Sequence, residues 1–208
     1  ISGKAGKVSV LHGLEGVSSP RVFIVGLGDQ DKFDAQAYAA ALSKGLRAVR
    51  ESPAQSVLVS LVDLDVPGRD RHWRLEQAVR AAGAELYQYT ATRKGRKQAL
   101  KRIELPGQDD TDTQVLVRAQ ALNQGIVFAK ELANRPPNIC TPAYMAEQAQ
   151  VLIDTVPGVT GEILDEDAME KLGMGSLLAV ARGSANRPRL IVLHWRAGPD
   201  NQAPHVLV

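Results

Sequence analysis

The chain has 208 residues, of which 44% are hydrophobic, 23% charged and 4% aromatic. This composition is typical of a globular protein and excludes disordered, collagen-like and membrane-spanning classes, because no apolar run approaches the ~20 residues needed to cross a bilayer. The net charge of +2 predicts no polyanionic partner from overall charge alone. The single cysteine excludes an internal disulfide framework and favours a reducing compartment.

Short β-type runs alternate with helical patterns in the first two-thirds of the chain, which predicts an α/β layer architecture. Asp34 is expected to cap a helix that Pro53 closes, and a second helix from Arg74 is expected to stop at Gly83. Ser56–Val62 is apolar on both faces and therefore predicts a buried central strand. The other expected strands are Lys7–Leu11, Arg21–Val25, Glu85–Tyr89 and Leu100–Leu105.

A polar stretch, Pro106–Asp110, then interrupts the pattern and predicts the main domain boundary. We expect an N-terminal α/β domain over residues 1–112, a connecting helix over residues 113–134, and the incomplete beginning of a second α/β domain over residues 135–208. One apolar stripe is expected along the connecting helix, formed by Val115, Ala119, Leu122, Ile126, Ala129 and Ala133.

The second domain is expected to open with a helix capped by Thr141, with Pro142 at its first position. Met145, Ala149, Leu152 and Ile153 are expected to face inward, and Pro157-Gly158 to stop this helix. The elements expected after it are a strand at Thr160–Leu164, a short helix at Glu166–Leu172, a buried strand at Arg189–Trp195 and a terminal strand at His205–Val208.

Most residues that could carry chemistry favour a structural interpretation. Gly26-Leu27-Gly28 follows a strand, but Asp31 stands where a dinucleotide fingerprint needs its third glycine, so a simple turn is expected. Asp63 and Asp65 could hold a hard cation, yet nothing nearby supplies further ligands and solvated charges are favoured. Cys140 is expected to be a structural thiol. The four histidines are scattered, so these residues predict no catalytic constellation and no metal site.

One charge cluster remains as a candidate binding site. Six basic residues fall within ten positions without an intervening acid: Arg93, Lys94, Arg96, Lys97, Lys101 and Arg102. On a mobile hairpin they could grip phosphates without reading base sequence. The alternative is a solvated loop whose charges are balanced by acids elsewhere in the fold.

From Asn134 onward the sequence resembles the opening of the catalytic domain of the leucyl (cytosol) aminopeptidase family. The resemblance is carried by Asn134-Arg135-Pro136-Pro137-Asn138, Thr141–Ala146, Leu172–Val180, Gly183–Asn186 and Pro188–Leu193, in the family's order. Upstream, Lys4-Ala5-Gly6 and Val25–Gly28 look like the family's variable N-terminal domain.

This resemblance implies a metal-dependent exopeptidase that removes N-terminal residues from peptides, leucine among the preferred ones. Family members carry two divalent cations, Mn or Zn, which bind the substrate amine and activate a bridging water. They assemble as cytoplasmic homo-hexamers, and no membrane partner is expected.

The family's metal-binding segments, of the form G-K-G…D and N-T-D-A-E-G-R, follow the strand that matches His205–Val208. No catalytic or metal residue can therefore be carried onto residues 1–208, and a strand and a helix expected before Ile1 are also missing. We expect the 208-residue polypeptide alone to be inactive and prone to aggregate.

Two alternatives stay open. Some bacterial members of the family also act as architectural DNA partners through their N-terminal domains, which gives the basic cluster a DNA-binding role. A purely structural role in assembly, after loss of catalysis, is the other.

Overall fold

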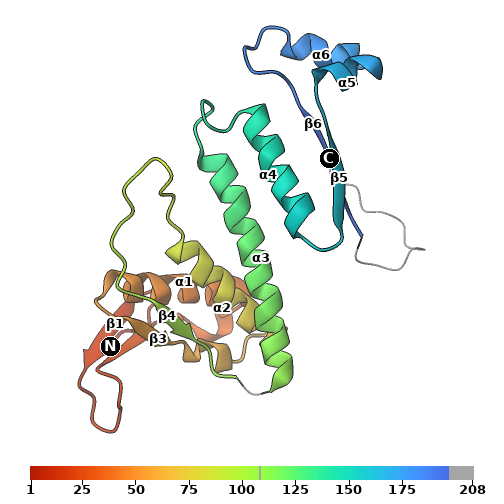
Figure 1. The fold of residues 1–208 in the computed structure, drawn as a ribbon. Coiled ribbons are helices and arrows are strands. Elements are labelled where there is room, and N and C mark those ends of the chain that lie inside the picture. Colours follow the sequence, from red (N-terminus) through yellow and green to blue (C-terminus); the bar gives the residue numbers. More distant parts are fainter. Residues whose placement is uncertain (108, 197–208) are drawn as a thin grey trace. The chain divides into compact units, whose positions relative to one another are not determined.

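The computed structural model describes residues 1–107 and 109–196 (Figure 1). The described residues form an α/β fold, as expected, and divide into two compact units, Ile1–Glu131 and a second unit beginning at Leu132. Among them, no helix combines the length and apolar character needed to span a bilayer. The predicted division at residues 112 and 134 stays a prediction, and the predicted strand His205–Val208 lies outside the described residues.

The first unit opens with an antiparallel hairpin, β1 (Val8–His12) with β2 (Arg21–Val25), in which Val8 pairs with Val25 and His12 with Arg21. A 3-10 turn, η1 (Gln30–Lys32), leads to helix α1 (Ala35–Glu51). Asp34 caps α1, as predicted, by accepting a hydrogen bond from the Ala37 N–H at 2.8 Å. The helix ends before Pro53, which cannot continue it.

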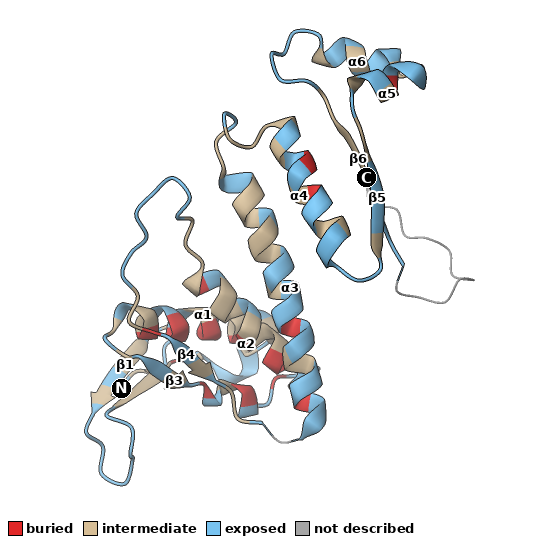
Figure 2. Cartoon of the chain, viewed as in Figure 1, coloured by how far each residue is buried: buried red, intermediate tan, exposed pale blue. Residues whose placement is uncertain are grey.

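The core of the first unit lies around α1 and α2 (Arg71–Leu86), as the buried residues in Figure 2 show. Tyr38, Leu42 and Leu46 recur at four-residue spacing on one face of α1 and are at most 4% exposed. Leu75 and Ala78 of α2 belong to the same buried hydrophobic cluster as these three residues of α1. The predicted helical periodicity of this segment is confirmed.

The predicted buried strand Ser56–Val62 is wrong beyond its first three residues. β3 (Ser56–Leu58) pairs in parallel with β4 (Arg102–Glu104), and the chain then turns into a 3-10 helix, η2 (Ser60–Asp63). Val59 and Val62 are both buried, and three residues per turn place them on the same side of the 3-10 segment. The apolar residues on both faces of this segment therefore mark a turn into the core.

Gly83 does not end α2, and Glu85–Tyr89 is not a strand; both predictions are wrong. The helix runs on to Leu86, and a Cβ at residue 83 would overlap the side-chain amide of Asn123, so this glycine allows a close approach between α2 and helix α3 (Asp110–Asn134). Glu85 is 6% exposed and faces α1. The hydrogen bond that it accepts from Arg47 holds the pKa of Glu85 below its ordinary value, against the opposing effect of burial.

Helix α3 confirms the predicted long helix, but its predicted apolar stripe is only partly buried. Ala119 is 1% exposed, whereas Leu122 is 47% exposed. Near its start, the buried Asp112 accepts a hydrogen bond from Arg71 at 2.9 Å. Periodicity therefore located the helix but overestimated how much of its face is covered.

The second unit pairs β5 (Val159–Leu164) with β6 (Leu190–Trp195) in an antiparallel ladder, against which α4 (Pro142–Thr155) packs. Thr141 caps α4 as predicted, and Ala149 is buried, but Met145 is 37% exposed rather than inward-facing. Two short helices, α5 (Glu166–Lys171) and α6 (Gly175–Ala181), join the strands; the sequence patterns predicted α5 and missed α6.

The strand β6 is not buried as predicted, because Trp195 is 71% exposed and Leu193 is 42% exposed. Within the described residues it has a partner on one side alone, and nothing covers these two side chains. An apolar strand becomes a buried one only when another layer packs on it.

Candidate functional site

The basic cluster lies on a long loop, residues 87–101, that leaves the first unit between α2 and β4 (Figure 1). Gln88 holds the loop closed, since its Oε1 accepts from the Arg96 N–H at 2.6 Å and its Nε2 donates to the Arg96 carbonyl at 3.2 Å. Gln98 adds a hydrogen bond from its Nε2 to the Leu86 carbonyl. The side-chain hydrogen bonds that hold the shape of the loop therefore come from two neutral residues, Gln88 and Gln98, and not from its charged side chains.

All six predicted basic residues are exposed. Arg102, at the start of β4, pairs with Glu104 at 2.8 Å. The other five form no ion pair with any residue that the structure describes, and they are Arg93, Lys94, Arg96, Lys97 and Lys101. Within the part of the chain that the structure describes, the expected balancing acids are thus present for one of the six, and the other five charges are not paired there.

The acidic candidates serve the fold. Asp63 lies 2.6 Å from Arg71, and Asp65 lies 3.1 Å from Arg74, so both are ion-paired, and both side chains also remain exposed to solvent. Over residues 1–107 and 109–196, no three His, Cys, Asp or Glu side chains gather closely enough to hold a metal ion.

The remaining candidates also have local explanations. Gly28 has a φ of +83° and donates its N–H to the Gly3 carbonyl at 2.9 Å, which confirms the glycine turn. Cys140 is a free, half-buried thiol. His12, His72 and His194 are exposed, and His205 lies outside the described residues.

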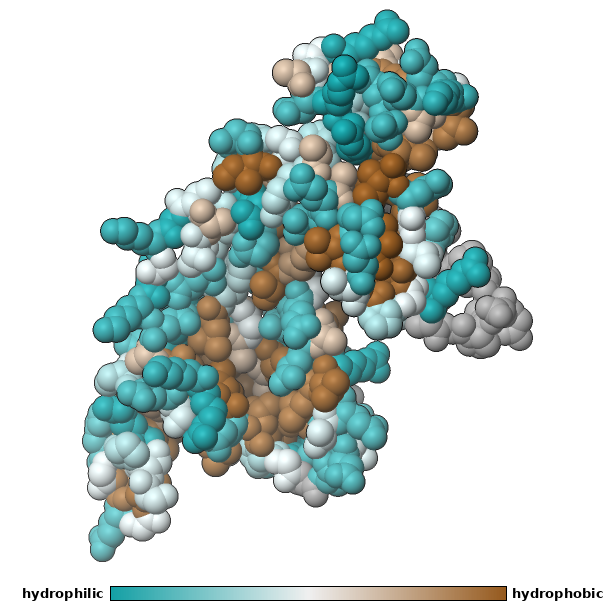
Figure 3. All heavy atoms as spheres, in the orientation of Figure 1, coloured by the Kyte–Doolittle hydropathy of each residue, from teal (hydrophilic) through white to brown (hydrophobic). Residues whose placement is uncertain are grey.

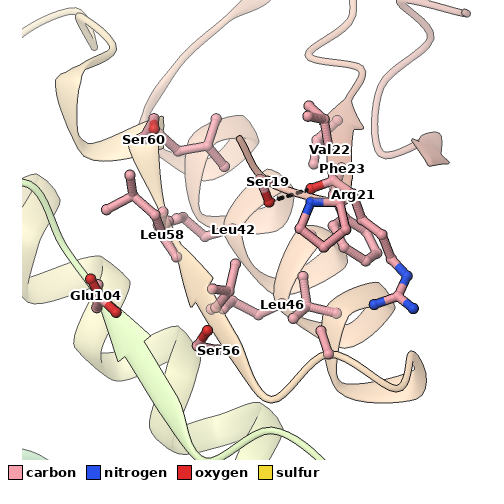
Figure 4. Close-up of a pocket in the computed structure, with 18 of the residues that line it drawn as sticks. Ser19, Arg21, Val22, Phe23, Leu42, Leu46, Ser56, Leu58, Ser60 and Glu104 are labelled. Carbon is pink, nitrogen blue, oxygen red and sulfur yellow. Dashed lines mark hydrogen bonds between the residues drawn. The ribbon is translucent and has the colours of Figure 1, made fainter. Parts of the chain in front are cut away.

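A groove of about 980 Å³ in the first unit was missed by the sequence reasoning. Figure 4 shows Arg21, Val22 and Phe23 of β2 along one side, and Ser56, Leu58 and Ser60 along the other. Its floor is the apolar face of α1, formed by Leu42, Gly45, Leu46 and Val49. No local motif indicates such a groove, because residues more than 30 positions apart in the sequence line it.

Two family models match the chain. Residues 1–96 match the N-terminal domain of the cytosol aminopeptidase family, and residues 127–208 match the catalytic domain of the same family. The two matches follow one another in chain order and leave residues 97–126 between them, which include the first part of the long helix α3.

Known proteins are similar over the whole chain. A probable cytosol aminopeptidase of Xylella fastidiosa strain M23 is 48% identical over 213 residues, and one of Xanthomonas oryzae pv. oryzae is 46% identical over 211 residues. All of this chain is matched in each case, but it spans 43% and 42% of those relatives' lengths. More than half of each relative therefore has no counterpart in residues 1–208.

Solved structures share the fold. The bottromycin maturation enzyme BotP in complex with Mn superposes with a TM-score of 0.78 at 26% identity, over 92% of this chain and 39% of that one. A mutant of tomato leucine aminopeptidase also has a TM-score of 0.78, at 25% identity over 97% of this chain and 40% of its own.

Proposed function

The chain belongs to the cytosol aminopeptidase family, and from this premise we propose that the protein is a metal-dependent aminopeptidase that releases N-terminal residues, leucine among them, from peptides. The observation that supports the proposal most directly is the match to both family domains in order, along 178 of the 208 residues. The described fold agrees with an N-terminal domain followed by part of a catalytic domain.

The described residues contain no binding site for the two divalent ions of the proposal, because no three potential ligands lie together among them. The similarity to a manganese-bound enzyme supports metal dependence of the family's chemistry. The residues that bind the two metal ions would belong to the part of the family's sequence that has no counterpart in residues 1–208. No catalytic step can be assigned to the side chains described above.

The test compares the full-length gene product with the polypeptide of residues 1–208 on leucine p-nitroanilide. The full-length product is expected to hydrolyse it, to lose most of its activity with EDTA and to recover it with Mn²⁺ or Zn²⁺. The 208-residue polypeptide is expected to be inactive. Chelator-resistant hydrolysis by the full-length product, or chelator-sensitive hydrolysis by residues 1–208 alone, would contradict the proposal.

The family premise also extends to assembly and compartment. We propose a homo-hexamer acting in the cytoplasm, supported by the resemblance to the family and by the relatives' description as cytosol aminopeptidases. The mass of the full-length product by light scattering checks the hexamer, and a monomer at micromolar concentration would exclude it.

A second function, binding of DNA phosphates, is favoured by one specific observation: five exposed basic side chains share a loop without acidic partners among the described residues. Such a loop can contact a polyanion without first breaking ion pairs of its own. Because the five cations lie on one loop, between positions 93 and 101, their binding would release several counterions from DNA.

The matched test replaces Arg93, Lys94, Arg96 and Lys97 by alanine in the full-length product. The slope of log affinity for duplex DNA against log salt is expected to flatten by about 0.9 for each phosphate that the variant no longer neutralises. A control variant removes four exposed cations elsewhere, Lys4, Arg118, Lys171 and Arg182, and is expected to keep more of the slope. Equal slopes in the loop variant and the unmodified protein would dismiss this function.

A further inference from the structure

The basic loop, residues 87–101, is held in shape by side chains and not by its own backbone. In the described part of the chain, no N–H or C=O of residues 88–100 bonds to another backbone group. Residues 90–97 are all exposed, so no packing in the core fixes their course. Such a segment has many conformations open to it unless a few specific contacts close it.

Two glutamines supply those contacts. Gln88 bonds both backbone groups of Arg96, because its Oε1 accepts from the N–H at 2.6 Å and its Nε2 donates to the carbonyl at 3.2 Å. Gln98 donates to the Leu86 carbonyl at 3.2 Å, nearer the base of the loop. The Gln88 side chain therefore ties residues 88–96 into a closed segment.

Gly95 gives independent evidence that the closed segment is tight. A Cβ at this position would lie 3.0 Å from the Thr90 Cγ2 and 3.4 Å from the Gln88 Oε1. The first distance is shorter than the optimum of about 3.5 Å or more between carbon atoms, so a larger residue would push the two sides of the segment apart. Glycine thus permits the close approach at the point where Gln88 acts.

The closure also holds like charges together. Four cations, Arg93, Lys94, Arg96 and Lys97, fall within five positions, which span at most about 14 Å in an extended chain. Among the described residues no acid pairs with any of the four. Their mutual repulsion favours an open loop, and the hydrogen bonds of Gln88 oppose it. Part of the free energy needed to gather the charges is therefore supplied before a polyanion binds.

We propose that Gln88 is the positioning residue of the basic loop, and that it presets the shape in which the four neighbouring cations contact the phosphates of duplex DNA. This role rests on the DNA-binding function proposed above. A preset loop loses less conformational freedom on binding, so Gln88 raises affinity without touching DNA. Because Gln88 carries no charge, it contributes nothing to the release of counterions that sets the salt dependence.

The affinity of the full-length gene product for duplex DNA, measured over a range of salt concentrations, tests this role. Gln88→Met keeps the length of the side chain but loses both hydrogen bonds to Arg96. It is expected to weaken binding by about tenfold at every salt concentration and to leave the slope of log affinity against log salt unchanged. Gly95→Ala, which strains the closed segment without removing a polar group, is expected to show the same pattern.

Gln120→Ala replaces an exposed glutamine on α3 and is the matched control, expected to bind DNA like the unmodified protein. Amide hydrogen exchange measures the closure directly: the Arg96 N–H is expected to exchange faster in Gln88→Met than in the unmodified protein or the control. The midpoint of thermal unfolding is expected to stay the same in Gln88→Met, since residues 90–97 bury nothing in the core.

The outcomes separate this role from the function on which it rests. DNA affinity that is unchanged in both Gln88→Met and Gly95→Ala would overturn the role of Gln88 and leave DNA binding standing. A flatter salt slope in Gln88→Met would also overturn it, because the loss would then come from phosphate contacts and not from loop shape. An unmodified protein that binds no DNA at low salt would overturn the function and the role together.

Discussion

Tyr38 shows how a single residue can be buried at a cost to its polar group. Its side chain is fully buried on α1, with its ring centroid 5.6 Å from that of Trp73. Its hydroxyl has no hydrogen-bond partner among the described residues. Burial raises the pKa of Tyr38 from 10.0 to about 12, because the phenolate would lose its hydration; the nearby Arg74 and Arg71 oppose this shift.

The raised pKa predicts a loss of stability in alkali. The stabilising contribution is complete below pH 10, where the unfolded tyrosine is still neutral, and is lost as pH rises toward 12. Tyr38→Phe is expected to remove this loss and to change stability at pH 7 by no more than about 1 kcal/mol. Urea unfolding at pH 7 and pH 11 measures both effects.

Tyr89→Phe is the control for that experiment, since Tyr89 is half-buried and accepts a hydrogen bond from Thr92. A Tyr38→Phe variant that lost as much stability as the unmodified protein between pH 7 and pH 11 would contradict the assignment.

At the scale of elements, side-chain caps set where most of the longer helices begin. Asp34, Asp70 and Thr141 each accept a hydrogen bond from a backbone N–H three residues later. These bonds satisfy donors that a helix leaves unpaired in its first turn. This is why the starts of α1 and α4 could be read directly from the residue types.

Asp34→Ala is expected to lower the free energy of unfolding of the first unit by about 1 kcal/mol, whereas Asp34→Asn should retain most of the stability. Asp31→Ala, an exposed carboxylate in the preceding 3-10 turn, is the matched control. Denaturant unfolding followed by circular dichroism measures the difference. Equal losses at positions 31 and 34 would show that charge, rather than capping, is responsible.

At the scale of the whole molecule, hydrophobic residues are exposed over the strands of the second unit, where Figure 3 shows them gathered. Leu193 and Trp195 lie on the same face of β6, because side chains two residues apart in a strand point the same way. Exposed apolar surface beside an unpaired strand edge promotes association.

The polypeptide of residues 1–208 is therefore expected to self-associate at micromolar concentration. The double variant Leu193→Lys and Trp195→Lys should lower the scattered light, because it places charge on the exposed face. His194→Lys alters the opposite face of the same strand and is the control. A monodisperse unmodified polypeptide would refute the prediction.

Much of the candidate site could be read from the sequence, and part of it could not. The run from Arg93 to Arg102 identified the basic loop, because clustered like charges are a local property. That Arg102 pairs with Glu104 while Arg93 and Lys97 have no described partner depends on where acids elsewhere in the fold lie. The groove had no local signal, since β2 and β3 contribute to it from distant parts of the chain.

By itself the sequence determined the family, the α/β class, the strands β1 and β2, the capped starts of α1 and α4 and the long helix α3, because motifs, caps and side-chain periodicity act over a few residues. Only the tertiary structure decided that the segment after Leu58 turns into the core, that Gly83 permits close packing against Asn123, and that Glu85 faces α1. Each of these outcomes depends on a partner from another part of the chain. Local sequence patterns show which face of a helix or strand is apolar. Whether that face is buried depends on the segments that the tertiary fold packs against it.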